Sequence, residues 1–252
     1  EDVYTFKFSY TNDKEATVSF AHTFSNDRVT AKINLFKVDK ETGKAVPQGD
    51  ATLKGAVYGL YAREDIVHPD GATGVIYIAG EQVASLTTDE KGQASVDGLY
   101  LGKYYVKEIT PPTGYLADTE EHDLECSYEG DMTAEVKREC ISSEQVIKQP
   151  FQIIKAANNG KTDADLLSGA GFTVYLKSSL TKKADGSYDF DSAKPVVSGE
   201  NGATEIFTDE KGYACSIPLP FGSYIVRETT TPHNYKPVDD FEVNITENHP
   251  NK

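Results

Sequence analysis

The sequence has few of the residues that form disulfide cross-links or bind metal ions in small proteins. Its 252 residues include no tryptophan, one methionine and only three cysteines. An odd, small number of cysteines excludes a disulfide framework. We therefore expect Cys126, Cys140 and Cys215 to be packed as reduced thiols. The five histidines are scattered, and no His/Cys cluster has the spacing of a zinc site.

Basic residues are also scarce. Lys and Arg number 25 against 40 Asp and Glu, which gives a net charge of −15. A polyanion does not gain by binding nucleic acid or an anionic membrane surface, so neither partner is expected. Such acidity is typical of a protein kept soluble outside the cell. No apolar run reaches membrane length, and neither a signal peptide nor a lipidation motif is present, so we expect a mature internal segment or targeting pieces outside this sequence.

Catalytic patterns are missing as well. No Ser/His/Asp grouping, paired carboxylates of a cleft motif or Gly-rich phosphate loop is found. Acidic pairs such as Asp239-Asp240 fit solvated turns. We therefore expect no cofactor, no metal and no enzyme active site, apart from the self-modification considered below.

Aromatic and turn-forming residues are plentiful. The chain has 15 Tyr, 11 Phe, 20 Gly and 11 Pro, a composition that favours strands split by turns. Most segments alternate with period two, as in Tyr4–Tyr10. Short strands at this spacing predict an all-β protein built of β-sandwiches. The segments 63–85 and 177–204 are insertions between strands, and the second has room for a short helix.

An internal repeat organises the chain. Residues 37–115 and 155–235 carry the same landmarks in the same order. The matching segments are Gly55–Tyr61 with Gly169–Tyr175, Thr88–Gly92 with Thr208–Gly212, and Gly102–Glu108 with Gly222–Glu228. Residues 4–37 also align without a gap onto 122–155. We therefore expect residues 1–29 to be the closing hairpin of a preceding or neighbouring domain, 30–147 a first sandwich, and 148–252 a second sandwich lacking its last strand.

One lysine and one glutamate per repeat fall on the apolar face of their strands. Alternation places Lys37 with Ile33 and Leu35, and Glu108 with Tyr104 and Val106. The second repeat places Lys155 and Glu228 in the same way. One interpretation is a pair at the strand ends that reaches water. The other is a buried pair present as neutral amine and neutral acid, in which the amine is a nucleophile and the acid polarises a neighbouring amide.

The repeats resemble SpaA-type or Cna B-type domains, the prealbumin-like stalk modules of Gram-positive pilins and surface adhesins. The resemblance rests on the opening strand with its Lys, the Gly55–Tyr61 run, Thr88–Gly92 and the segment Tyr105–Tyr115, and it covers nearly the whole chain. It implies tandem Ig-like or prealbumin-like β-sandwiches in an extracellular protein of the cell wall or pilus. In this family the Lys of the first strand forms an isopeptide bond with an Asn or Asp of the last strand, assisted by a Glu.

The resemblance assigns Lys37 and Lys155 as the amine donors of isopeptide bonds. It assigns Glu108 and Glu228 as the acids that assist them. Asn26 occupies the acceptor position, but for a preceding or neighbouring domain. Its equivalent in the first full domain is Glu144, which does not replace Asn in the usual reaction. The remaining acceptor candidates there are Asp118, Asp123 and Asp131; in the second domain Asn244 alternates with apolar neighbours and is expected to face outward.

These features predict a structural stalk or fibre repeat. Asn26 of one molecule could meet Lys155 and Glu228 of the next by strand addition, in a head-to-tail assembly. Alternatively, the second domain lacks its last strand because the sequence is a segment cut from a longer array of repeats. The alternative function is an adhesin domain that binds a host or matrix ligand through Ile76–Ile78 or Tyr188–Phe190.

Overall fold

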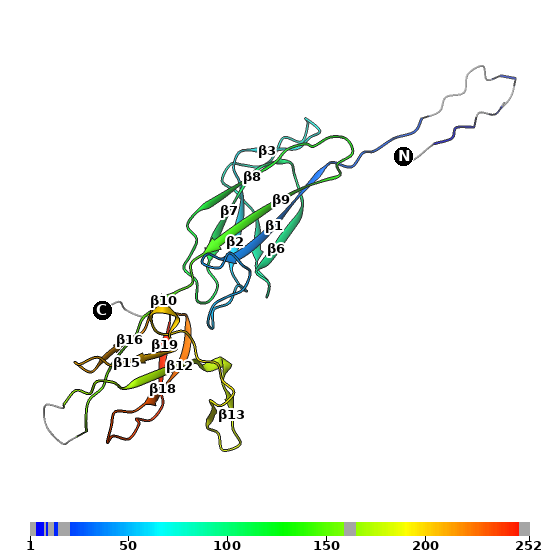
Figure 1. Ribbon diagram of the computed structural model, residues 1–252. Helices are drawn as coiled ribbons and strands as arrows, with labels where there is room; N and C mark the ends of the chain where they lie inside the picture. Colours follow the sequence, from blue (N-terminus) through cyan, green and yellow to red (C-terminus); the bar gives the residue numbers. More distant parts are fainter. Residues whose placement is uncertain (1–3, 8, 10–12, 15–20, 159–164, 247–252) are drawn as a thin grey trace.

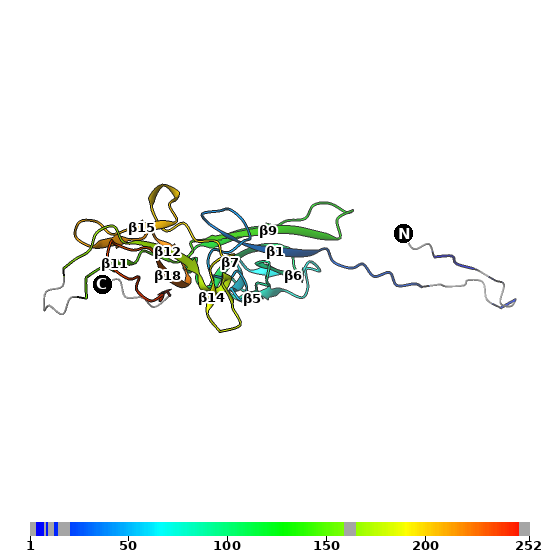
Figure 2. The ribbon, with the colours of Figure 1, turned by 60° about the horizontal axis from the view of Figure 1, so that its bottom comes forward.

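The computed structural model describes residues 4–7, 9, 13–14, 21–158 and 165–246. Within these residues the chain is almost entirely β-structure, as predicted. The only helices among the described residues are two short 3-10 turns, Lys177–Ser179 and Glu200–Gly202, both in the second insertion. Figures 1 and 2 show two β-domains placed end to end. The N-terminal arm, 21–29, projects from the end of the first domain opposite to the second.

The first domain is a sandwich of two main sheets. One has the order β6-β1-β9 and the other β5-β2-β7-β8, with a small β3-β4 ribbon beside them. The strands are β1 (Thr30–Asp39), β2 (Val57–Ala62), β3 (Ile66–Val67), β4 (Val75–Tyr77), β5 (Gln82–Thr87), β6 (Gln93–Leu99), β7 (Gly102–Thr110), β8 (Glu121–Cys126) and β9 (Glu135–Glu144).

The second domain repeats this plan with a shorter first sheet. Its larger sheet has the order β15-β12-β18-β19, opposed by the pairs β10-β17 and β11-β16; β13-β14 is a separate ribbon. The strands are β10 (Lys148–Gln149), β11 (Gln152–Ile154), β12 (Gly171–Leu176), β13 (Thr181–Lys182), β14 (Tyr188–Asp189), β15 (Glu205–Phe207), β16 (Tyr213–Cys215), β17 (Leu219–Pro220), β18 (Gly222–Thr230) and β19 (Phe241–Ile245). Pro150, which has no amide N–H to donate, separates β10 from β11, the two parts that correspond to β1.

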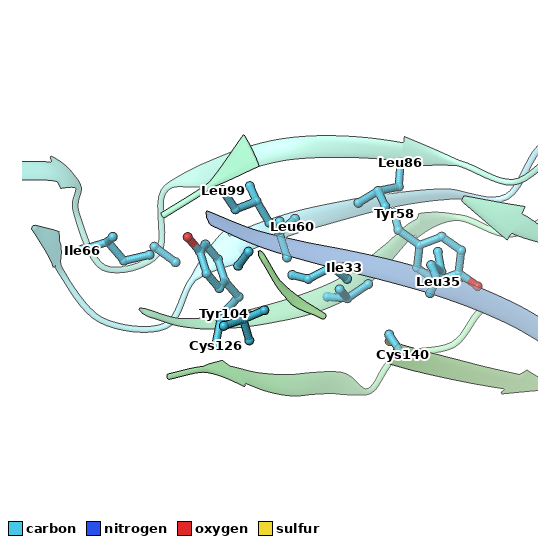
Figure 3. Close-up of a cluster of buried hydrophobic side chains, with 14 of the residues drawn as sticks. Ile33, Leu35, Tyr58, Leu60, Ile66, Leu86, Leu99, Tyr104, Cys126 and Cys140 are labelled. Carbon is cyan, nitrogen blue, oxygen red and sulfur yellow. The ribbon is translucent and has the colours of Figure 1, made fainter. Parts of the chain in front are cut away.

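The core of the first domain comes from the inward faces of both sheets. Strand β1 alternates half-buried and buried positions along its whole length, with Ala31, Ile33 and Leu35 fully buried. Figure 3 shows Tyr58 and Tyr104 on opposite sides of Leu60 and Ile33 in this cluster. Each buried aromatic ring removes a large apolar area from water, which is the main favourable term in folding.

Strand β9 pairs in an arrangement that alternation alone does not predict. It runs parallel to β1 in continuous register from Thr30↔Glu135 to Asp39↔Glu144. A turn around Glu129–Met132 separates β8 from β9, and the two strands belong to different sheets rather than to one hairpin. The connection therefore crosses from one layer of the sandwich to the other.

The expected thiols are free but not all packed. Cys126 and Cys140 are buried, and burial raises the pKa of Cys140 to about 12. Cys215 is exposed, which corrects the expectation that it is packed. Its position in β16 alternates with the inward-facing Ala214 and therefore turns the thiol to solvent.

The expected N-terminal hairpin is only partly described, because residues 1–3, 8, 10–12 and 15–20 lie outside the described residues. The described parts of its two arms are in contact. The ring of Tyr4 lies 4.1 Å from that of His22 and 5.1 Å from that of Phe24, measured between centroids. Phe24 is 65% exposed, so this arm carries apolar side chains without a core of its own.

Candidate functional site

Lys37 lies fully buried near the end of β1 and faces three polar side chains. Its Nζ forms an ion pair with Glu144 Oε2 and lies 3.5 Å from Glu108 Oε1 and 3.4 Å from the Tyr58 hydroxyl. Both carboxylates are buried. The predicted inward position of Lys37 and Glu108 is therefore confirmed, and neither side chain reaches water.

Glu144 is held at its other oxygen by two hydroxyl groups. Glu144 Oε1 lies 2.7 Å from the Tyr58 hydroxyl and 3.0 Å from Ser142 Oγ. Ser142 and Glu144 both point inward because they are two residues apart on β9, opposite Lys37 and Asp39 of β1. The parallel pairing of the two strands thus brings Glu144 to the lysine.

The network continues through Asp118 to His122. The backbone N–H of Asp118 donates to Glu108 Oε2 at 2.7 Å, and Asp118 Oδ2 lies 3.1 Å from Ser142 Oγ and 2.7 Å from His122 Nε2. Asp118 was predicted as an alternative acceptor, whereas Tyr58, Ser142 and His122 were not predicted from the sequence. A hydroxyl at an inward strand position, as at Tyr58 in the Gly55–Tyr61 run, was the available signal.

Burial shifts the pKa of the first domain's lysine. Burial lowers the pKa of Lys37 to about 8, against the opposing effects of the Glu108 and Asp118 carboxylates, which raise it. A lysine with this pKa combines partial nucleophilic character with an ion pair to Glu144.

The second domain contains the same Lys and Glu pair with fewer hydrogen-bonding side chains around it. Lys155 Nζ lies 2.7 Å from Glu228 Oε2, which also accepts the backbone N–H of Val238 at 2.8 Å. Phe172 replaces Tyr58, so this hydroxyl is absent. Glu228 Oε1 is buried and has no hydrogen-bond partner within the described residues. A donor supplied from elsewhere would satisfy it.

The other acceptor candidates lie away from the lysines. Asp123 pairs with Arg63 on the surface, and the Tyr128 hydroxyl donates to Asp131 in an exposed turn. Asn244 is exposed, as predicted, and accepts a hydrogen bond from Ser223. Asn26 is exposed in the N-terminal arm. The structure therefore brings together Lys37, Glu108 and Glu144, and separately Lys155 and Glu228.

We predict that Tyr58→Phe destabilises the first domain. Loss of the hydroxyl leaves Glu144 Oε1 with one donor in a buried site, which costs about 1–3 kcal/mol. Calorimetry of the variant measures the change. Tyr105→Phe, on the outer stack with Tyr61, is the matched control and should change stability by less than about 0.5 kcal/mol. An equal effect of the two substitutions would contradict the role of the Tyr58 hydroxyl.

Two segments, residues 31–139 and 150–252, match one family of known domains, the SpaA prealbumin-like fold domain. The chain belongs to this family. No curated protein matches it. The two matched segments account for most of the sequence and include Lys37, Glu108, Lys155 and Glu228, whereas Glu144 lies between them.

Among solved structures, the Bacillus anthracis TIE protein supports the same fold. The Bacillus anthracis TIE protein is 25% identical, with a TM-score of 0.55, over 87% of this SpaA-type chain and 32% of its own. The Streptococcal ancillary pilin is 22% identical over 88% of this chain and 61% of its own, with a TM-score of 0.33. The shaft pilin SpaA of Lactobacillus rhamnosus GG is 18% identical over 86% and 93%, with a TM-score of 0.30. The chain thus spans about a third of the length of the first of these proteins and 61% of the second.

No helix within the described residues is long and apolar enough to span a membrane. Across the same residues no group of three or more His, Cys, Asp or Glu side chains is arranged to hold a metal ion.

Proposed function

We propose that this chain is a load-bearing stalk segment of a Gram-positive surface fibre, located outside the cell. The parallel pairing of β1 with β9 is the observation that carries this proposal. Chain tension enters the first domain at the start of β1 and leaves at the end of β9. Because the strands are parallel, the two loaded ends lie at opposite ends of the ladder.

This geometry loads the ladder in shear. Both strands are ten residues long, and their hydrogen bonds stretch together instead of opening one at a time. A pair loaded at the same end would peel by breaking single bonds in succession. A ligand-binding domain has no need of this arrangement, whereas a tether under tension benefits from it directly.

Single-molecule force spectroscopy tests the stalk proposal. The first domain should resist end-to-end pulling at several times the force needed when cysteine handles at Lys32 and Lys137 peel β1 from β9, since these residues are cross-strand neighbours. Similar unfolding forces in the two geometries would reject a load-bearing role. Binding of a matrix protein or glycan at the Ile76–Ile78 surface, with no such mechanical anisotropy, would favour the adhesin alternative.

The proposal extends to assembly through the second domain. Strand β11 pairs with β16 on one edge, and no strand within the described residues lies on its other edge. The corresponding edge of β1 is occupied by β9. A free edge of this kind accepts an added strand through its backbone N–H and C=O groups. The gapless alignment of residues 4–37 with 122–155 makes the N-terminal arm of a second copy a suitable strand.

Strand addition in this register would bring Asn26 of one copy to Lys155 of the next, since Asn26 corresponds to Glu144. Lys155 Nζ would attack the side-chain carbonyl carbon of Asn26, and the C–N bond to the amide nitrogen would break. Glu228 would carry the proton from the amine to the departing ammonia. The unsatisfied Glu228 Oε1 supports this assignment, because the Asn26 amide N–H would supply its missing donor.

The first domain is proposed to remain without a cross-link. Glu144 occupies the acceptor position and forms an ion pair with Lys37 there, so the domain is held by packing and charge alone. Lys37 and Glu108 then act as a structural pair rather than as donor and assistant.

A further inference from the structure

Strand β9 of the first domain has a free edge. It is the outer strand of the sheet β6-β1-β9, and no strand within the described residues pairs with its other side. The carbonyl of Glu144 faces β1, because it accepts the N–H of Lys40 at 2.8 Å. Backbone groups alternate between the two edges of a strand, so those of Ile141 and Ser143 face away from β1. The N–H and C=O groups of these two residues therefore lie on the free edge.

Both ends of this edge are closed by other parts of the chain. The Arg138 guanidinium donates to the carbonyl of Lys137 at 2.8 Å and to a carbonyl of β8 at 2.6 Å. At the other end the N–H of Leu116 donates to the carbonyl of Gln145 at 2.9 Å. Covering an edge in this way prevents unwanted strand pairing. The open part is thus limited to residues 139–143, enough for a short extended segment.

A hollow of about 470 Å³ lies beside the open part of the edge. Ile141 and Ser143 line it on one side, and the segment 116–120 lines it on the other. Ile141 is 60% exposed and Leu116 is 55% exposed, so aliphatic side chains border the hollow. The open backbone edge is therefore accompanied by space for the side chains of an added segment.

The hollow contains an ionised carboxylate. Asp118 lines it, with a side chain that is 10% exposed, and the exposed Glu120 lies next to it. Burial raises the pKa of Asp118, but hydrogen bonds from the Glu120 N–H and the nearby His122 ring outweigh this effect and hold that pKa below its ordinary value. Asp118 and Glu120 therefore give this part of the hollow a negative charge at neutral pH.

The other charged residues of the hollow leave this negative charge in place. Glu144 also lines the hollow but forms an ion pair with the buried Lys37. Lys40 lies beside Glu144, next to the closed end of the edge, whereas Asp118 lies 3.1 Å from Ser142 Oγ, opposite the open part. The open part of the edge is thus matched to a cation.

We propose that this edge binds a short extended segment of a partner protein, with one Lys or Arg side chain directed to Asp118. The segment would pair with the backbone groups of Ile141 and Ser143, a mode in which main-chain hydrogen bonds give affinity and alternate side chains give specificity. Its basic side chain would form a charge-assisted hydrogen bond with the carboxylate. Aliphatic side chains of the same segment would lie beside Ile141 and Leu116. This site is separate from the β11 edge and does not depend on strand addition there.

Synthetic peptides test the site on the unaltered protein. The probe is a short peptide of alternating Val and Thr with one central Lys in place of Thr, and titration calorimetry measures its affinity. Replacing the central Lys by Glu should weaken binding at least about tenfold, because like charges then meet at Asp118. Methylating the amide nitrogens along the pairing edge of the probe should abolish binding, since these groups can no longer donate. Failure of the Lys probe to bind at millimolar concentration would overturn the proposal.

Ser143→Pro tests the edge from the side of the protein. Proline removes the N–H at this position, and the β1–β9 ladder keeps its bonds because the backbone groups of Ser143 face away from β1. The Lys probe should no longer bind, whereas Ser143→Ala, which keeps the N–H, should bind it as the parent does. Circular dichroism checks that both variants are folded. Equal binding to Ser143→Pro and to the parent would rule out pairing at this edge.

Charge reversal at the hollow tests its preference for a basic segment. Glu120→Lys should weaken binding of the Lys probe about tenfold and strengthen binding of the Glu probe. Glu210→Lys makes the same charge change in an exposed turn of the second domain and should alter neither affinity. If Ser143→Pro instead reduces self-association in sedimentation while neither probe binds, the occupant is a second copy of this chain and the proposed basic partner is rejected.

Discussion

Lys37→Ala should destabilise the first domain by about 3–5 kcal/mol, because it leaves Glu108 and Glu144 buried without their cation. Water cannot solvate the two carboxylates in place of the lysine, since both are enclosed between the sheets. Calorimetry should show the first-domain transition at a markedly lower temperature. The second-domain transition should remain within experimental error of the parent protein.

The double variant Lys37→Met/Glu144→Leu is the matched control for this prediction. It removes the ion pair without leaving Glu144 charged, and the hydroxyls of Tyr58 and Ser142, 3.0 Å apart, can then bond to each other. Replacing a buried ion pair by apolar side chains is often neutral. We expect the double variant to recover at least half of the loss. A Lys37→Ala domain as stable as the parent would show that the buried network contributes little.

Lys155→Arg should abolish covalent multimers. Arginine keeps a positive charge beside Glu228, but its guanidinium stays protonated and cannot act as the nucleophile. Glu228→Gln should slow formation of the bond by roughly 100-fold or more, because the proton carrier is lost. Denaturing gels of concentrated protein, sampled over time, measure both effects.

Lys182→Arg, at an exposed residue of β13, is the control and should leave the series of covalent multimers on the gel unchanged. Asn26→Ala should remove the ladder as completely as Lys155→Arg does, because it deletes the acceptor. Covalent multimers that persist in the Lys155→Arg protein would assign the link to another lysine. Sedimentation under native conditions then shows if strand addition continues without the bond.

Much of the fold is predictable from the sequence because it repeats. The period of two along 31–37 places Lys37 inward, and the same rule places Glu108, Lys155 and Glu228 correctly. Matching landmarks also indicate two similar sandwiches, in agreement with the two matched family segments. Alternation determines which face a residue occupies, so predictions of face were confirmed.

Strand partners and hydroxyl contacts were harder to predict from the sequence. The period of β9 gives its inward residues but not the strand beside it, and only the parallel pairing with β1 brings Glu144 to Lys37. Tyr58 alternates like any core aromatic, so its hydroxyl contact with Glu144 depends on a strand 86 residues further along the chain. Cys215 was predicted to be packed, but its outward position on the short strand β16 leaves it exposed.

The most direct test of the central claim is the intact mass of the concentrated protein under denaturing conditions, followed by peptide mapping. The account predicts a ladder of multimers, each link lighter by one ammonia and joining Lys155 of one copy to Asn26 of the next. It also predicts unmodified Lys37 peptides. A single unmodified monomer mass at high concentration, or an intramolecular bond at Lys37, would contradict it.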